Sequence, residues 1–74
     1  MGGDEVRKAR EAAGLTQEEL AFRTKLHRTY ISMIERDVNS LTLPTLFRIC
    51  KALDIRPSTL VARIEKSHRQ RSEK

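Results

Sequence analysis

The side chains best suited to recognising another molecule in this chain lie close together, between residues 28 and 33. Arg28 can donate two parallel hydrogen bonds to O6 and N7 of a guanine base, a contact worth about 1–3 kcal/mol of discrimination. Thr29 can offer its hydroxyl to a base or a phosphate, or its methyl group to thymine. Ser32 and Met33 follow, and Met33 can touch a thymine methyl or cover the edge of the groove. The alternative for Arg28 is a contact to phosphate alone.

Two short helices joined by a tight turn would position these residues. Residues 16–36 read TQEELAFRTKLHRTYISMIER, and their apolar positions fall one helical turn apart on each side of a break near Lys25. Ala21 is small at the point where the two helices would cross. This is the pattern of a helix-turn-helix, in which the second helix enters a major groove about 12 Å wide and its first residues face the base edges.

The rest of the chain predicts an all-α fold of five helices and no strands. The first helix is expected over 3–13, the second after Thr16 in a capping box with Glu19, and the third over 28–36. A fourth follows Thr42, and a fifth begins at Pro57. The expected apolar stripe of the fourth helix is Leu43, Leu46, Phe47, Cys50 and Leu53. Residues 1–66 are predicted to form one helix-turn-helix domain (motif 17–36), with a basic, flexible tail over 67–74.

Charge is unevenly distributed along the 74 residues. The net charge is +5, yet residues 1–22 carry a net −2, whereas residues 23–36 and 63–74 each carry a net +3. A basic patch of this kind favours a phosphate backbone as the partner, the alternative being an ordinary solvated basic surface. One cysteine excludes an intrachain disulfide and fits a reducing cytoplasm. Cys50 is expected to be a core residue. We find no membrane-length apolar run, signal peptide, metal-ligand spacing or phosphate loop, so no membrane, cofactor, metal site or catalytic residue is predicted.

Residues 16–36 resemble the lambda-repressor-like (XRE-type) helix-turn-helix regulators, and the run LHRTYIS is most similar to the controller proteins of restriction–modification systems. The resemblance covers roughly residues 4–66 and implies a compact five-helix DNA-binding domain. In the controller proteins the Arg-Thr-Tyr run contacts DNA, which implies the same for Arg28, Thr29 and Tyr30. Tyr30 can instead pack its ring on the domain and offer only its hydroxyl to a phosphate.

The resemblance also implies contacts to the DNA backbone. Gln17 would clamp a phosphate at the start of the second helix, where the helix dipole favours an anion. Lys25 stands where most family members have glycine, and His27 stands where Ser, Thr or Asp usually caps the third helix. The full set of expected DNA-binding residues is Gln17, Arg23, Lys25, His27, Arg28, Thr29, Tyr30, Ser32, Met33, Arg36, Asn39 and Ser40. Of these, Arg23, Lys25 and Arg36 are expected to act as general electrostatics.

Two further structural expectations concern the orientation and pairing of the domain. Arg10 and Glu35 are expected to form a salt bridge that holds the third helix at its docking angle, as in several family members. A symmetric homodimer is expected through the fourth and fifth helices, with an interface of Ile49, Ile55, Val61 and Ile64. The alternative is that these four residues simply close the core of one protomer.

The function predicted from these features is a sequence-specific regulator of transcription that binds double-stranded DNA as a homodimer on a palindromic operator. It would act as a small repressor or an autoregulatory controller in the bacterial cytoplasm, associated with the nucleoid. Glu18 and Glu19 could contact RNA polymerase, although acidic residues at a helix start are commonly dipole partners. The alternative function is a protein-interaction module of the antitoxin or coactivator type.

Overall fold

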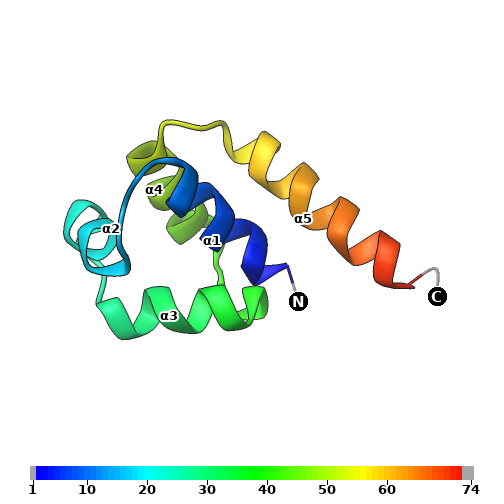
Figure 1. The fold of residues 1–74 in the computed structure, drawn as a ribbon, viewed down its shortest axis with the longest axis horizontal. Coiled ribbons are helices and arrows are strands. Elements are labelled where there is room, and N and C mark those ends of the chain that lie inside the picture. Colours follow the sequence, from blue (N-terminus) through cyan, green and yellow to red (C-terminus); the bar gives the residue numbers. More distant parts are fainter. Residues whose placement is uncertain (1, 73–74) are drawn as a thin grey trace.

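The structure, a computed structural model, describes residues 2–72, with side chains described as far as residue 67. It is all-helical over this range, as predicted. The helices are α1 (Gly3–Ala12), α2 (Gln17–Thr24), α3 (Arg28–Arg36), the short 3-10 helix η1 (Val38–Ser40), α4 (Leu43–Leu53) and α5 (Pro57–Ser72). Figure 1 shows α3 along one edge of the molecule, with α1, α2 and α4 stacked above it and α5 running past α1.

The ends of the first three helices follow the local signals in the sequence. Gly14, at φ 75°, lets the chain turn after α1. The capping box at the start of α2 is present: the Glu19 N–H donates to Thr16 Oγ1 over 3.1 Å, and the Thr16 N–H donates to Glu19 Oε1 over 2.8 Å. The latter bond, from the Thr16 backbone, is the main reason that the pKa of Glu19 lies below its ordinary value.

The core lies between the inner faces of α1 to α4 and the start of α5. Its fully enclosed apolar side chains include Leu20, Ile31, Ile34 and Leu60. The buried residues of α4 are Leu46, Ile49, Cys50 and Leu53. The predicted stripe of α4 is therefore partly wrong, because Leu43 and Phe47 are 66% and 55% exposed.

The same rotation of α4 overturns one expected dimer residue. Ile49 is only 1% exposed, so it belongs to the core of the protomer and cannot supply contact area to a second copy. Ile55 and Ile64 are half-buried and pack against the core, whereas Val61 is 46% exposed. Of the four predicted interface residues, Val61 alone is largely available.

Helix α5 is longer than the sequence indicated. A break was expected near residue 66, but the helix continues to Ser72. The flexibility assigned to residues 67–74 stays a prediction, and its last two residues lie outside the described part of the chain. Within residues 2–72, no helix is both long enough and apolar enough to cross a membrane.

Candidate nucleic-acid interface

Helix α3 presents a polar outer face with the residues expected to read bases. Ile31 and Ile34 point into the core, which leaves Arg28 and Thr29 exposed at the start of the helix. Met33 is 42% exposed on the next turn, and Ser32 is half-buried. Arg36 is also exposed, at the end of the helix. A helix that lies at an edge of the molecule (Figure 1) and keeps its first turn free has the shape required to enter a major groove.

The orientation of α3 is held by a buried ion pair to α1. Arg10 Nε donates to Glu35 Oε2 over 2.7 Å, and Arg10 Nη2 donates to Glu35 Oε1 over 3.1 Å. Arg10 Nη1 donates in addition to the Leu15 carbonyl oxygen over 2.8 Å. The hydrogen bond to Glu35 is the main reason that the pKa of Arg10 is raised, against the opposing effect of burial. The expected salt bridge is confirmed.

Gln17 takes part in this network, which the sequence did not indicate. Its side chain is half-buried, and Nε2 donates to Glu35 Oε1 over 3.1 Å. Glu35 thus joins α1, α2 and α3 through a single carboxylate. What Gln17 offers to a phosphate in this arrangement is its backbone N–H, because the N–H groups of a first helical turn have no partner within the helix.

Tyr30 is tied to the segment that follows α3. Its ring is half-buried against the core, and its hydroxyl donates to the Ser40 carbonyl oxygen over 2.8 Å. Of the two roles considered for Tyr30, ring packing on the domain is therefore the one observed, and its hydroxyl proton is already engaged. The Asn39 N–H donates to Asp37 Oδ1 over 3.0 Å, which leaves the Asn39 side chain exposed beside half-buried Ser40.

These contacts form η1, which the sequence analysis missed. An Asp whose side chain accepts a hydrogen bond from the N–H two residues later is a recognised turn signal. The pair of Asp37 and Asn39 could therefore have predicted the turn. Because η1 positions the loop after α3, it also positions Asn39 and Ser40, the two loop residues expected to meet DNA.

The turn between α2 and α3 has the geometry that the departures in its sequence allow. Lys25 adopts a left-handed conformation, at φ 59°, where most L-residues are strained. His27 caps α3, with Nδ1 accepting the Thr29 N–H over 3.1 Å. The His27 ring is exposed, as are the side chains of Lys25 and Arg23.

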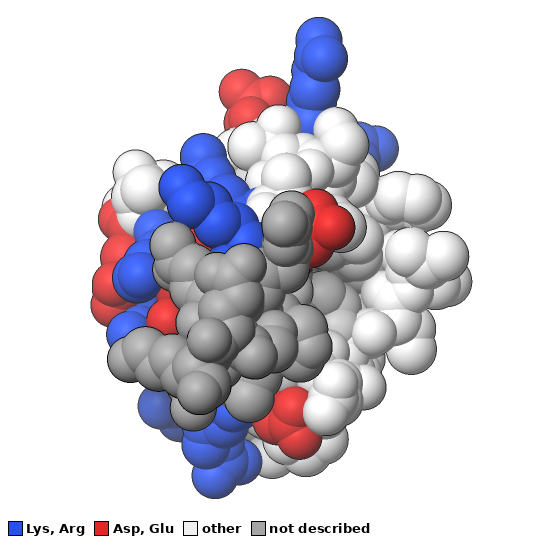
Figure 2. Space-filling view, turned by 90° about the vertical axis from the view of Figure 1, so that its right-hand side faces the viewer, with Lys and Arg blue, Asp and Glu red and all other residues white. Residues whose placement is uncertain are grey.

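Charge and apolar surface are separated on the molecule. Figure 2 shows Lys and Arg side chains over one side and the lower edge, the level at which α3 lies in Figure 1. The opposite side of this view is covered by uncharged side chains. Among the described residues, no group of three or more His, Cys, Asp or Glu side chains could hold a metal ion. Cys50 is enclosed in the core, where burial raises the pKa of its thiol.

The comparison with protein families supplies the identification. The helix-turn-helix family matches residues 6–60, which is most of the chain. The chain belongs to the helix-turn-helix family. Within it, the chain is 43% identical over 60 residues to the control protein C.BamHI of Bacillus amyloliquefaciens, covering 80% of this chain and 74% of the relative. It is 42% identical over 60 residues to the control protein C.SmaI of Serratia marcescens, covering 81% and 71%.

Solved structures agree with this assignment. Two variant crystal structures of the restriction–modification controller protein C.Esp1396I superpose with a TM-score of 0.79, at 37% and 35% identity, over 88% of this chain and 87% of theirs. The helix-turn-helix protein described here is therefore similar to controller proteins in both sequence and fold. It is a DNA-binding transcription regulator of the helix-turn-helix type and not an enzyme.

Proposed function

We propose that this helix-turn-helix protein binds a palindromic DNA operator as a homodimer and regulates transcription as a repressor or an autoregulatory controller. The observation that carries the proposal is the rigid mounting of α3 by Arg10 and Glu35, with Arg28 and Thr29 free on its first turn. Arg28 reads a guanine, Thr29 contacts a base or phosphate, and Ser32 and Met33 line the groove. Operator binding would place the protein on the bacterial chromosome.

Phosphates on either side of the groove are held by the flanking elements. The Gln17 backbone N–H receives one at the start of α2, and exposed Arg36 attracts the backbone at the far end of α3. Asn39 and Ser40 lie in the loop after α3. Tyr30 supports that loop through its hydrogen bond to Ser40 rather than reading a base.

The dimer interface is proposed on the outer apolar surface of α4 and α5. Leu43 and Phe47 lie one turn apart on α4 and are more than half exposed, and Val61 is exposed on α5. Exposed apolar side chains of this size are costly in a monomer and mark association surfaces when they are contiguous. Two copies related by a twofold axis would present their α3 helices to half-sites about one DNA turn apart.

The test is selection of binding sites from a random duplex library with the full chain, followed by affinity measurements on the selected site. We expect an enriched palindrome, and we expect Arg28→Ala to lower affinity by about 1–3 kcal/mol at one base pair of each half-site. Arg63→Ala, which removes an exposed Arg on α5, is the control. Equal losses for Arg28→Ala on all duplexes would show that Arg28 reads no base.

Dimerisation is tested separately by sedimentation of the wild type and of Phe47→Asp. The charge should dissociate the dimer without unfolding the protomer, because Phe47 lies largely in solvent in one copy. A monomeric wild type at micromolar concentration would refute the proposed interface.

A second partner is favoured by one observation on α2. Phe22 is 85% exposed, and Glu18 beside it is also exposed, whereas Glu19 is occupied by the capping box. We propose that this surface contacts a protein, with RNA polymerase the candidate that fits a regulator. Phe22→Ser should keep operator affinity and lose transcriptional activation. Equal loss of both would place Phe22 in the DNA interface instead.

A further inference from the structure

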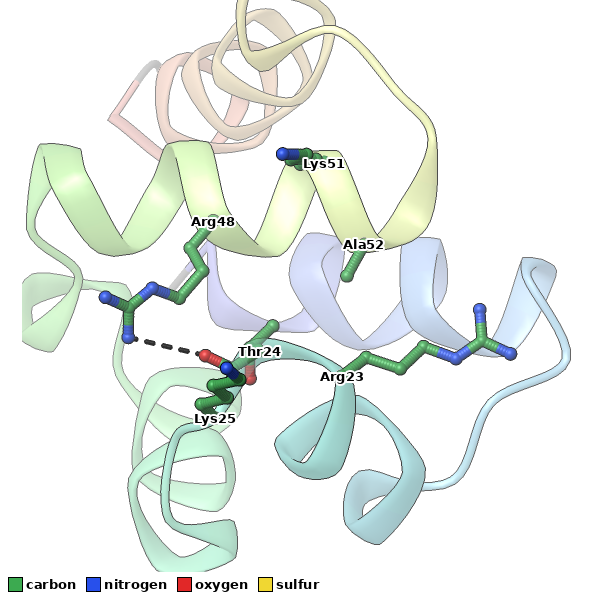
Figure 3. A pocket seen from close by; sticks show the side chains of 6 residues that line it. All are labelled: Arg23, Thr24, Lys25, Arg48, Lys51 and Ala52. Atoms are coloured by element: carbon green, nitrogen blue, oxygen red, sulfur yellow. Dashed lines mark hydrogen bonds between the residues drawn. The ribbon is translucent and has the colours of Figure 1, made fainter.

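A hollow of about 530 Å³ lies between the end of α2 and the middle of α4, away from the reading face of α3. We call it the α2–α4 hollow, and its lining residues are Arg23, Thr24, Lys25, Arg48, Lys51 and Ala52. Figure 3 shows α4 above and α2 below, with the Arg48 and Lys25 side chains at one side and Arg23 reaching toward the other. Four of the six lining residues are cations, and none is acidic.

These four cations are not neutralised by the protein. Within the described side chains, residues 2–67, the salt bridges are formed by Lys8 and Arg10, and no carboxylate lies within 4.0 Å of a charged nitrogen in the hollow. Arg23 acts on Glu19 only through space. Because like charges raise the free energy of the folded state, the hollow is a place where a bound anion would be stabilising.

Part of this cluster is held in place by hydrogen bonds. Arg48 Nη1 donates to the Thr24 carbonyl oxygen over 3.3 Å, a bond drawn in Figure 3. Thr24 is itself fixed, since its hydroxyl donates to the Leu20 carbonyl oxygen over 2.7 Å and its side chain is buried. Lys25 is set by its left-handed backbone. The charges are therefore arranged before any ligand arrives.

Helix dipoles offer a simpler reason for some of these residues. Arg23 and Lys25 lie at the C-terminal end of α2 and Lys51 lies in the last turn of α4, where cations offset the partial negative charge of the helix end. This explanation does not cover Arg48 in the middle of α4. It also does not explain why the cations of two different helices line the same hollow.

We propose that the α2–α4 hollow binds phosphate groups at a site separate from the base-reading residues of α3. The ligand is either a free polyphosphate or the backbone of DNA flanking the operator half-site. Arg guanidinium groups match phosphate oxygens with paired N–H donors, and Lys ammonium groups add point charges. The DNA source rests on the proposed function, and the free-polyphosphate source does not.

The first test is titration of the full-length chain with inorganic tripolyphosphate, followed by NMR and calorimetry. Arg48→Gln combined with Lys51→Gln should weaken binding about ten-fold or more, because two of four cations are lost. The matched control is Arg7→Gln combined with Lys66→Gln, which removes one Arg and one Lys from exposed positions outside the hollow. It should change binding less than about two-fold. Lys51→Gln alone serves if loss of the Arg48–Thr24 bond impairs folding.

The second test uses the selected operator in a short duplex and in one extended on both sides. Each phosphate contact contributes about 0.9 to the slope of log affinity against log salt. If flanking DNA is the source, the hollow variant loses about one to two contacts' worth of slope on the long duplex and none on the short one.

The outcomes separate the sources and can overturn the proposal. Tripolyphosphate binding that depends on Arg48 and Lys51 identifies a free polyphosphate. A slope change confined to the long duplex identifies flanking DNA. Absence of both effects, or equal losses in the control variant, refutes the site. If no operator is selected, the proposed function fails, and the tripolyphosphate titration alone decides the hollow.

Discussion

Arg10 and Glu35 form two parallel hydrogen bonds, of 2.7 and 3.1 Å, between α1 and the end of α3. Both residues are buried, and the Glu35 carboxylate also accepts from Gln17 at the start of α2. The three helices that determine how α3 would meet DNA are thus joined by one ion pair. This geometry makes the pair an organiser of the reading face.

Removing one partner of this pair should be costly. Arg10→Met leaves the Glu35 carboxylate buried without its main partner, and we expect a loss of about 3–5 kcal/mol in the free energy of unfolding, measured with urea. Arg10→Met with Glu35→Leu should recover much of that loss, because no charge is then left buried. Lys8→Met, at an exposed ion pair, is the control and should cost under about 1 kcal/mol. A loss as small as the control's in Arg10→Met would contradict this account.

Gly3 allows α1 to approach the backbone of α3. A Cβ at this position would lie 2.5 Å from the Ile34 carbonyl oxygen and 2.6 Å from that of Glu35. Gly3→Ala should therefore push the two helices apart and cost about 1–3 kcal/mol in thermal or urea unfolding. Gly14→Ala is the comparison, since nothing lies within 4 Å there and only the positive φ opposes the methyl group. If Gly3→Ala unfolds like the wild type, the close approach is not required.

Lys25→Gly should stabilise the protein. Lys25 is held at φ 59°, and glycine removes a left-handed strain of about 1–2 kcal/mol, less the entropy that glycine loses on folding. We expect a net gain of up to about 1 kcal/mol by chemical denaturation. Asp54 has nearly the same φ, 58°, but Asp tolerates this region better, so Asp54→Gly should gain less. Equal gains at both positions would argue against strain specific to lysine.

Two neighbouring apolar residues of α2 should behave in opposite ways. Leu20 is fully buried, and Leu20→Ala should cost about 2–5 kcal/mol through lost burial and a cavity. Phe22 is largely in solvent, so Phe22→Ala should change stability by less than about 0.5 kcal/mol. Urea unfolding of both variants decides the matter. A large loss for Phe22→Ala in dilute monomer would show that its ring is packed in solution.

The errors in the sequence analysis arise where several arrangements satisfy the same pattern. On α4 the spacing i, i+3, i+4 and i+7 is met both by a stripe that includes Leu43 and Phe47 and by one that includes Ile49. Both stripes contain Leu46, Cys50 and Leu53. Packing against the neighbouring helices selects the second, so Ile49 is buried and Phe47 faces solvent.

Signals carried by a few consecutive residues were enough to predict most of the fold. The Thr16–Glu19 capping box, the break at Lys25 and Pro57 at the start of α5 each act through backbone geometry within one turn, so they can be read without the rest of the molecule. The family resemblance added the Arg10–Glu35 pair, and that pair is confirmed. The DNA contacts assigned to α3 and its flanks stay predictions.

Other features depend on residues distant in the chain that meet only after folding. The Gln17–Glu35 hydrogen bond, the Tyr30–Ser40 tie and the rotation of α4 follow from how neighbouring helices pack, which no local pattern encodes. The α2–α4 hollow brings Lys25 near Arg48 in the same way. Local propensity acts over one helical turn, whereas a side chain's burial and partners are properties of the whole packed domain.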